Sequence, residues 1–282
     1  MKVLLNIIKF IIAIILTICV IALIIVNVAS STILNKEFIL AKLDETNYYA
    51  NINTAVKSDF ENYIYQSGLD ENVLENIVSP EKVENDTKII INNIYDGTNE
   101  EVDVTEIETN LRNNIENSLD HKLSATQQKT VDEFIKKITE QYKDTITKTS
   151  YENSINNMLE KARNIVDKLQ KVSIIGIAVA FIIIIILSIK DFMTGLMLIG
   201  SALMSSGVFY ILVNMLINAK VKIQNITILN DAVSISLRDI ISTILSNLTT
   251  IGIALSIIGL VVIIVFAFIK SCKKEESENV EQ

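Results

Sequence analysis

The residues of this chain that are best suited to catalysis are few and are not grouped. His121 is the only histidine, and the chain contains no Ser/His/Asp, HExxH or GxSxG pattern. A single imidazole beside Lys122, near the end of an expected helix, suits an interaction with the helix dipole better than catalysis or metal binding. We therefore expect no catalytic residue, no cofactor and no enzymatic activity.

A run of acidic residues is the strongest candidate for holding a metal ion. It consists of Glu100, Glu101, Asp103, Glu106 and Glu108. Carboxylates bind hard cations such as Ca²⁺, but this run lacks the EF-hand spacing and the glycine that turns such a loop sharply. The sequence therefore favours a solvated loop, and we expect no metal site.

Four long apolar stretches dominate the rest of the chain. They cover residues 10–28, 172–189, 193–217 and 249–269, and none contains a charged residue. Each is long enough to cross a hydrocarbon core of roughly 30 Å at about 1.5 Å per residue. The chain is therefore predicted to be an integral membrane protein that contacts the lipid bilayer. Transporters usually place ionisable residues within the membrane, and these spans have none.

These stretches divide the chain into nine segments. We expect a cytoplasmic N-terminus (1–9), transmembrane helix 1 (10–31), an extracytoplasmic helical domain (32–171), transmembrane helix 2 (172–189), a cytoplasmic turn (190–192), transmembrane helix 3 (193–217), an external amphipathic loop or helix (218–248), transmembrane helix 4 (249–269) and a cytoplasmic tail (270–282).

The basic residues near the spans predict the orientation. Lysines close to membrane segments are retained in the cytoplasm. Both termini and the short turn carry lysines at positions 2, 9, 190, 270, 273 and 274, whereas the longer loop at 218–248 carries Lys220, Lys222 and Arg238. We therefore expect a multi-pass plasma-membrane protein with both termini cytoplasmic. The alternative is a cleaved signal peptide at residues 10–28, although this apolar stretch is longer than a usual signal-peptide core.

The composition of the polar domain limits its partners and its fold. Residues 36–171 hold 16 basic and 26 acidic residues, a net charge of −10, so we expect no nucleic-acid partner. Trp is absent, Pro occurs once and Gly eight times, which favours long helices. The heavy use of Ile, Asn and Lys is typical of an AT-rich bacterial genome, and we give the abundance of asparagine no functional weight.

The polar domain contains no cysteine. Cys19 lies in the first apolar stretch and Cys272 follows the last, so the domain has no disulfide. Ile18 precedes Cys19, where lipid attachment needs a small residue, and we interpret Cys19 as a buried apolar side chain.

Apolar residues recur at helical spacing through the polar domain. A first stripe runs from Ile39 to Ile64 and is expected to continue the helix of the first span. Ser79-Pro80 predicts a helix start and Asp96-Gly97 its end. Thr105/Glu108 and Ser124/Gln127 match the capping box. The last stripe runs from Val131 to Leu169 into the second span, with a bend expected at 145–154. These elements predict an antiparallel helical bundle.

Two further patterns concern packing. Small residues repeat along the faces of the spans, including Gly252, Ser256 and Gly259, and allow close approach of helices. The loop at 218–248 holds apolar residues at helical spacing. It is expected to form an amphipathic helix that packs within the protein or lies at the membrane interface.

One part of the polar domain resembles a known group of proteins. The segments Ser67-Gly68-Leu69-Asp70-Glu71-Asn72-Val73-Leu74 and Ile94-Tyr95-Asp96-Gly97 are similar to uncharacterised multi-span membrane proteins of low-GC Gram-positive bacteria with a helical extracytoplasmic domain. The resemblance implies placement in a bacterial plasma membrane and implies nothing about mechanism.

Together these observations predict an all-α, four-span membrane protein with an extracytoplasmic helical bundle between the first and second spans. We expect this bundle to bind or scaffold an unknown protein partner, or a second copy of the chain, without catalysis. The alternatives are a subunit of a transport or export system, or an extracellular ligand sensor.

Overall fold

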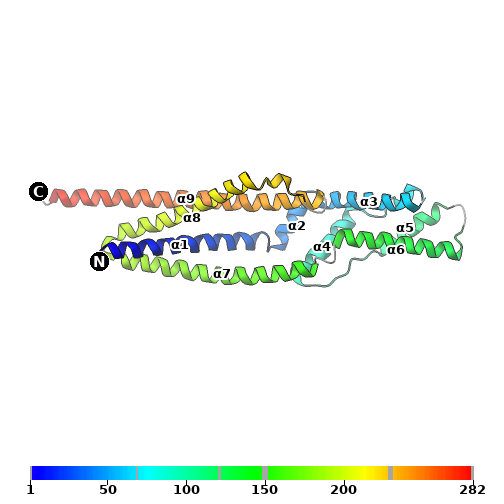
Figure 1. Ribbon diagram of the computed structural model, residues 1–282, viewed down its shortest axis with the longest axis horizontal. Helices are drawn as coiled ribbons and strands as arrows, with labels where there is room; N and C mark the ends of the chain where they lie inside the picture. Colours follow the sequence, from blue (N-terminus) through cyan, green and yellow to red (C-terminus); the bar gives the residue numbers. More distant parts are fainter. Residues whose placement is uncertain (1, 68, 120–121, 148–151, 228–230, 281–282) are drawn as a thin grey trace. The chain divides into compact units, whose positions relative to one another are not determined.

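The computed structural model describes residues 2–67, 69–119, 122–147, 152–227 and 231–280 (Figure 1). Across these residues the fold is all-α, with nine α-helices and three short 3₁₀ segments. The chain divides into two compact units. The apolar unit comprises Met1–Ile33, Ala162–Ile226 and Ile240–Gln282, and the polar unit comprises Leu34–Lys161 and Thr227–Asp239. The predicted fold class is confirmed.

Four helices are long and apolar enough to cross a membrane: α1 (Lys2–Ser31), α7 (Glu152–Leu187), α8 (Phe192–Lys220) and α9 (Asp231–Val280). The short 3₁₀ segments η2 (Ile189–Asp191) and η3 (Ile223–Asn225) flank α8. Large aliphatic side chains such as Ile14, Ile182 and Ile264 remain exposed on these helices. Such surfaces are stable in contact with lipid, so the chain is a multi-pass membrane protein with four candidate spans.

Helices α1, α7 and α8 pack around a small apolar core. Its buried members are Leu16, Val20, Ala180, Ile184 and Ala202. Two hydroxyl groups of α8 form hydrogen bonds to α1. The Ser206 hydroxyl donates to the Thr17 carbonyl at 3.3 Å, and the Tyr210 hydroxyl donates to the Ile21 carbonyl.

The predicted small-residue face of the fourth span is confirmed as a packing surface. A Cβ atom added at Gly252 would lie 2.8 Å from the Gly207 carbonyl oxygen of α8. One added at Gly259 would lie 2.5 Å from the Gly200 carbonyl oxygen. Both distances are shorter than the van der Waals contact distance of a Cβ atom and an oxygen atom. The backbones of α8 and α9 therefore approach each other more closely than a larger residue would permit.

The polar unit contains the remaining helices. They are α2 (Lys36–Glu45), α3 (Tyr48–Ser67), the 3₁₀ segment η1 (Glu71–Leu74), α4 (Pro80–Asp96), α5 (Thr105–Asn117) and α6 (Ala125–Thr147). Helix α3 packs against α4 and α6, and α5 packs against α6 and η1. The predicted stripes form the core, which includes Val56, Phe60, Ile107, Leu111, Ile115, Ile138 and Tyr142, each with no exposed surface.

Several local signals act as predicted. The Ser79 side chain accepts a hydrogen bond from the Lys82 backbone N–H, Pro80 occupies the first turn of α4, and Gly97 ends this helix at φ 70°. The Gln127 side chain accepts a hydrogen bond from the Ser124 backbone N–H at 3.0 Å, and the Ser124 hydroxyl accepts one from the Gln127 backbone N–H at 3.4 Å, as a capping box requires.

Other local predictions are wrong. Thr105 is the first residue of α5 and does not cap it, because the Asp103 side chain accepts the Thr105 backbone N–H at 2.9 Å. The first stripe does not continue the helix of the first span. Helix α1 ends at Ser31, Asn35 caps α2, and Asn47, at φ 52°, separates α2 from α3.

The last stripe is divided between two helices. Helix α6 ends at Thr147 and α7 begins at Glu152, while residues 148–151 of the predicted bend lie outside the described residues. The second half of the stripe was expected to be buried in the bundle. Ile155, Met158, Ile165 and Leu169 are instead exposed.

Part of the amphipathic segment at 218–248 packs in the polar unit. Residues 231–239 form the first turns of α9 and belong to the polar unit, where Ala232 joins the core. The hydroxyl groups of Thr46 and Ser236 lie 2.7 Å apart. Lys42 pairs with Asp239 at 3.1 Å and with Glu45 at 2.5 Å. The hydrogen bond to Glu45 is the main cause that raises the pKa of Lys42, and Asp239 raises it further. Burial has the opposite effect and lowers this pKa.

A buried carboxylate joins α4 to α6. Asp86 is 2% exposed, and it accepts hydrogen bonds from the Tyr142 hydroxyl at 2.5 Å and from the Lys82 ammonium at 2.7 and 2.8 Å. Burial and the Asp86 carboxylate raise the pKa of Tyr142 far above its usual value, so its hydroxyl remains a donor. Lys82 also donates to the Asp103 carbonyl at 2.7 Å.

Replacing this buried carboxylate should destabilise the polar unit. In Asp86→Ala, the buried Tyr142 hydroxyl loses its acceptor and the Lys82 ammonium keeps only the Asp103 carbonyl, at a cost of about 2–3 kcal/mol. The melting temperature of the full-length protein in detergent should fall by about 5–10 °C. The matched control is Asp132→Ala, which removes an exposed ion pair with Arg112 and should change stability by less than about 1 kcal/mol. Equal losses in both variants would contradict this role for Asp86.

Close packing of α8 and α9 gives a second prediction. Gly259→Ala raises helix propensity, yet its methyl group would meet the backbone of Gly200 and Met204. We expect overpacking to lower stability by about 1–3 kcal/mol, seen as a lower melting temperature in detergent. The control Val261→Ile enlarges an exposed side chain of the same helix and should have little effect. A Gly259→Ala protein as stable as the control would exclude tight packing at this face.

Candidate functional site: a groove lined by asparagine

The residues singled out for chemistry in the sequence do not form a site in the described structure. His121 lies outside the described residues. Within the described ranges, no group of three or more His, Cys, Asp or Glu side chains is placed to hold a metal ion. In the acidic run, Asp103 accepts hydrogen bonds from the side chain and backbone of Thr105, which lower its pKa. The Glu100 backbone bonds to Asn93.

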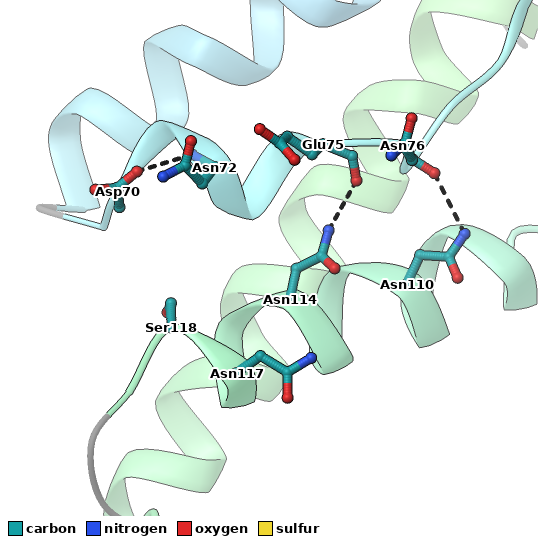
Figure 2. Close-up of a pocket in the computed structure, with 8 residues that line it drawn as sticks. All are labelled: Asp70, Asn72, Glu75, Asn76, Asn110, Asn114, Asn117 and Ser118. Atoms are coloured by element: carbon teal, nitrogen blue, oxygen red, sulfur yellow. Dashed lines mark hydrogen bonds between the residues drawn. The ribbon is translucent and has the colours of Figure 1, made fainter.

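A cavity in the polar unit is the best candidate for a binding site. It has a volume of about 570 Å³ and lies between η1 and α5 (Figure 2). We call it the amide groove. Its lining comprises Asp70, Asn72, Glu75, Asn76, Asn110, Asn114, Asn117 and Ser118. Its volume lies within the range of about 300–1,000 Å³ that is usual for ligand sites.

One side of the amide groove is the short segment around η1. The Asp70 side chain caps η1 by accepting a hydrogen bond from the Asn72 backbone N–H at 2.9 Å. Asn76 has φ 57°, a left-handed conformation that asparagine tolerates better than most residues. Val73, Ile77 and Val78 are buried in the core. The segment is therefore anchored by its apolar residues, and its polar residues are left at the surface.

The other side is one face of α5. Asn110, Asn114 and Asn117 are spaced i, i+4 and i+7, so they lie in a row along the helix. Ile107, Leu111 and Ile115 form the neighbouring face and are fully buried. Burial of this apolar face fixes the rotation of α5 and directs the asparagine row toward η1.

Hydrogen bonds from this row hold the η1 segment in place. The Asn114 amide nitrogen donates to the carbonyls of Val73, at 3.0 Å, and Glu75, at 2.8 Å. The Asn110 amide nitrogen donates to the Asn76 carbonyl at 3.5 Å. Figure 2 shows the Asn110 and Asn114 side chains pointing from α5 toward the opposite segment. The row therefore binds main-chain carbonyls of the same protein.

The charge of the lining is negative. Asp70 and Glu75 are the charged members, and none of the eight lining side chains is basic. A neighbouring cavity of about 490 Å³ shares Asn72, Glu75 and Asn76 and is also lined by Lys57, Glu61, Glu71 and Leu74. The two cavities together favour neutral or positively charged polar groups over anions.

The lining is rich in hydrogen-bonding groups. Each asparagine side chain offers one carbonyl acceptor and one NH₂ donor, and each carboxylate offers acceptors only. The groups of the lining that are able to act as a base or a nucleophile are the Asp70 and Glu75 carboxylates and the Ser118 hydroxyl.

Comparison with known proteins gives no relative. No family model, curated protein or solved structure matches this chain.

Sequence reasoning missed this groove. The asparagine row was visible as an i, i+4, i+7 pattern beside the apolar stripe of α5, but asparagine was assigned to genome composition. Its partners are main-chain carbonyls 34 to 41 residues away, which no local pattern identifies.

Removing the central asparagine should loosen the η1 segment. Asn114→Ala deletes two hydrogen bonds to backbone carbonyls, with an expected cost of about 1–2 kcal/mol. Hydrogen exchange measured by mass spectrometry on the full-length protein should become faster in peptides covering residues 71–78. The control Asn117→Ala removes an exposed amide from the same row and should leave this exchange unchanged. Unchanged exchange in Asn114→Ala would show that the row does not hold the segment.

Proposed function

We propose that this protein is a non-catalytic binding or scaffold protein of the plasma membrane, whose extracytoplasmic helical domain captures a partner through the amide groove. The observation that carries the proposal is the groove itself, a cavity of about 570 Å³ lined by amides, carboxylates and a hydroxyl group. Such a lining recognises polar groups through hydrogen bonds of defined geometry.

The proposed placement rests on the distribution of charge. Lysines cluster near both termini and at the turn around residue 190, which supports cytoplasmic termini and an external polar domain. The resemblance to membrane proteins of low-GC Gram-positive bacteria supports a bacterial plasma membrane. In this arrangement, the groove faces molecules outside the cell.

A second candidate, an external ligand sensor, is favoured by α9. This helix begins with residues 231–239 in the polar unit, where Lys42 pairs with Asp239 and Thr46 contacts Ser236. It continues without interruption through the fourth candidate span to Val280. A change in α2 would therefore act directly on a helix that also crosses the membrane.

Crosslinking in intact cells tests the proposed function. A photoreactive amino acid in place of Asn117 stands at the exposed end of the groove, and the same residue in place of Glu133 stands on the exposed surface of α6. We expect position 117, but not position 133, to yield a discrete adduct with another protein or with a second copy of this chain. Identical adduct patterns at the two positions would contradict a role for the groove.

Reconstitution provides the complementary test. The purified protein in liposomes should move no ions or common solutes, because the apolar stretches at residues 10–28, 172–189, 193–217 and 249–269 contain no charged residue for coupling. Robust, saturable flux through the isolated protein would replace the scaffold proposal with a transport function.

A further inference from the structure

The asparagine row of α5 already binds a polypeptide backbone. Three hydrogen bonds run from Asn110 and Asn114 to the carbonyls of Val73, Glu75 and Asn76. These contacts use main-chain atoms of the η1 segment, so they do not depend on which side chains that segment carries. The row therefore binds main-chain carbonyl groups.

The asparagine row of α5 extends beyond the η1 segment that it binds. Asn117 is exposed and lines the amide groove. Figure 2 shows it below Asn114, on the side away from Glu75. Among the described residues, no hydrogen bond joins its side chain to another group, and the adjacent Ser118 donates its hydroxyl to the Ile115 carbonyl at 2.8 Å and keeps acceptor capacity. A peptide group, with one donor and one acceptor, is the complement of such an amide.

The charge of the groove selects among peptides. Asp70 and Glu75 line it without a basic residue, and Glu61 and Glu71 line the neighbouring cavity with Lys57 as its basic member. The surrounding domain has a net charge of −10 over residues 36–171. Lysine or arginine side chains of a ligand would be attracted, whereas phosphate or acidic segments would be repelled.

We propose that the amide groove binds a short, extended, basic segment of a partner polypeptide. The ligand's backbone continues the row of main-chain contacts at Asn117 and Ser118, and its basic side chains face Asp70 and Glu75. This inference rests on the proposed function and specifies its ligand. A saccharide is disfavoured, because the lining has no aromatic or aliphatic side chain to cover the apolar face of a sugar ring.

Peptide binding to the purified full-length protein in detergent tests the proposal. The probes are three fluorescein-labelled molecules: a decapeptide of alternating lysine and threonine, the same decapeptide with glutamate in place of lysine, and chitotetraose. Fluorescence anisotropy should show saturable binding of the lysine peptide alone. Preferred binding of the glutamate peptide or of chitotetraose, or no binding of the lysine peptide up to millimolar protein, would overturn the proposal.

Substitutions distinguish peptide binding by the groove from attraction of the peptide to the overall negative charge of the domain. The double variant Asp70→Asn and Glu75→Gln keeps polar groups at both positions, and the amide carbonyl introduced at position 70 can still cap η1. It should weaken binding about fivefold. Asn117→Leu, which blocks the backbone contact, should weaken it at least as much. The control Glu133→Gln with Glu140→Gln removes two exposed charges from α6 and should leave affinity within about twofold. Equal weakening by the groove and control variants would assign binding to the general charge and overturn the proposal.

The two levels of the proposal fail differently. If no lysine peptide binds but crosslinking at position 117 captures a partner, the groove is a binding site for another chemistry and only the peptide inference fails. If the crosslinking pattern also shows no dependence on position 117, both proposals fail.

Discussion

The polar unit depends on a carboxylate that is almost completely buried. Asp86 would be costly to bury alone, and it is stabilised by the Tyr142 hydroxyl and the Lys82 ammonium. The same lysine donates to the Asp103 carbonyl, and Asp103 accepts the first backbone N–H of α5. At the other end of this loop, Asn93 bonds to Thr98 and Glu100. Buried polar residues of α4 thus fix the point at which α5 begins, and with it the position of the asparagine row.

Most of the stability of the polar unit comes from residues outside the groove. The apolar stripes of α3, α5 and α6 build the core, and the polar side chains of α4 order the loop that precedes α5. The groove presents amides and carboxylates at the surface, and two of its asparagines, Asn110 and Asn114, also hold the η1 segment. The four apolar helices serve a different purpose, since their exposed aliphatic side chains suit lipid and their glycines allow close contact. In the proposed function, the membrane helices anchor the protein and the polar unit carries the specificity.

The sequence predicted the elements whose signals are local. Ser79-Pro80 and Gly97 bound α4 because capping and left-handed glycine act within a single turn. The start of α2 was missed because apolar residues on both sides of Asn35 keep a helical period through the break. Thr105 fits the capping pattern, but it is the first residue of α5 and the Asp103 carboxylate accepts its backbone N–H. The groove was beyond local reasoning, because it depends on contacts between α5 and carbonyls of the η1 segment. The burial of Asp86 was also beyond local reasoning, because its partner Tyr142 lies 56 residues away in the sequence.

Cysteine accessibility in intact cells tests the central claim most directly, because it reports orientation and occupancy together. In a chain without Cys19 and Cys272, Asn117→Cys reports on the groove and Glu133→Cys on the exposed face of α6. An impermeant maleimide should label position 133 equally fast in intact cells and in the purified protein. Position 117 should react more slowly in cells than in the purified protein, because a partner covers it there. Labelling of neither position until the membrane is opened would contradict an external domain, and equal protection ratios at both positions would contradict an occupied groove.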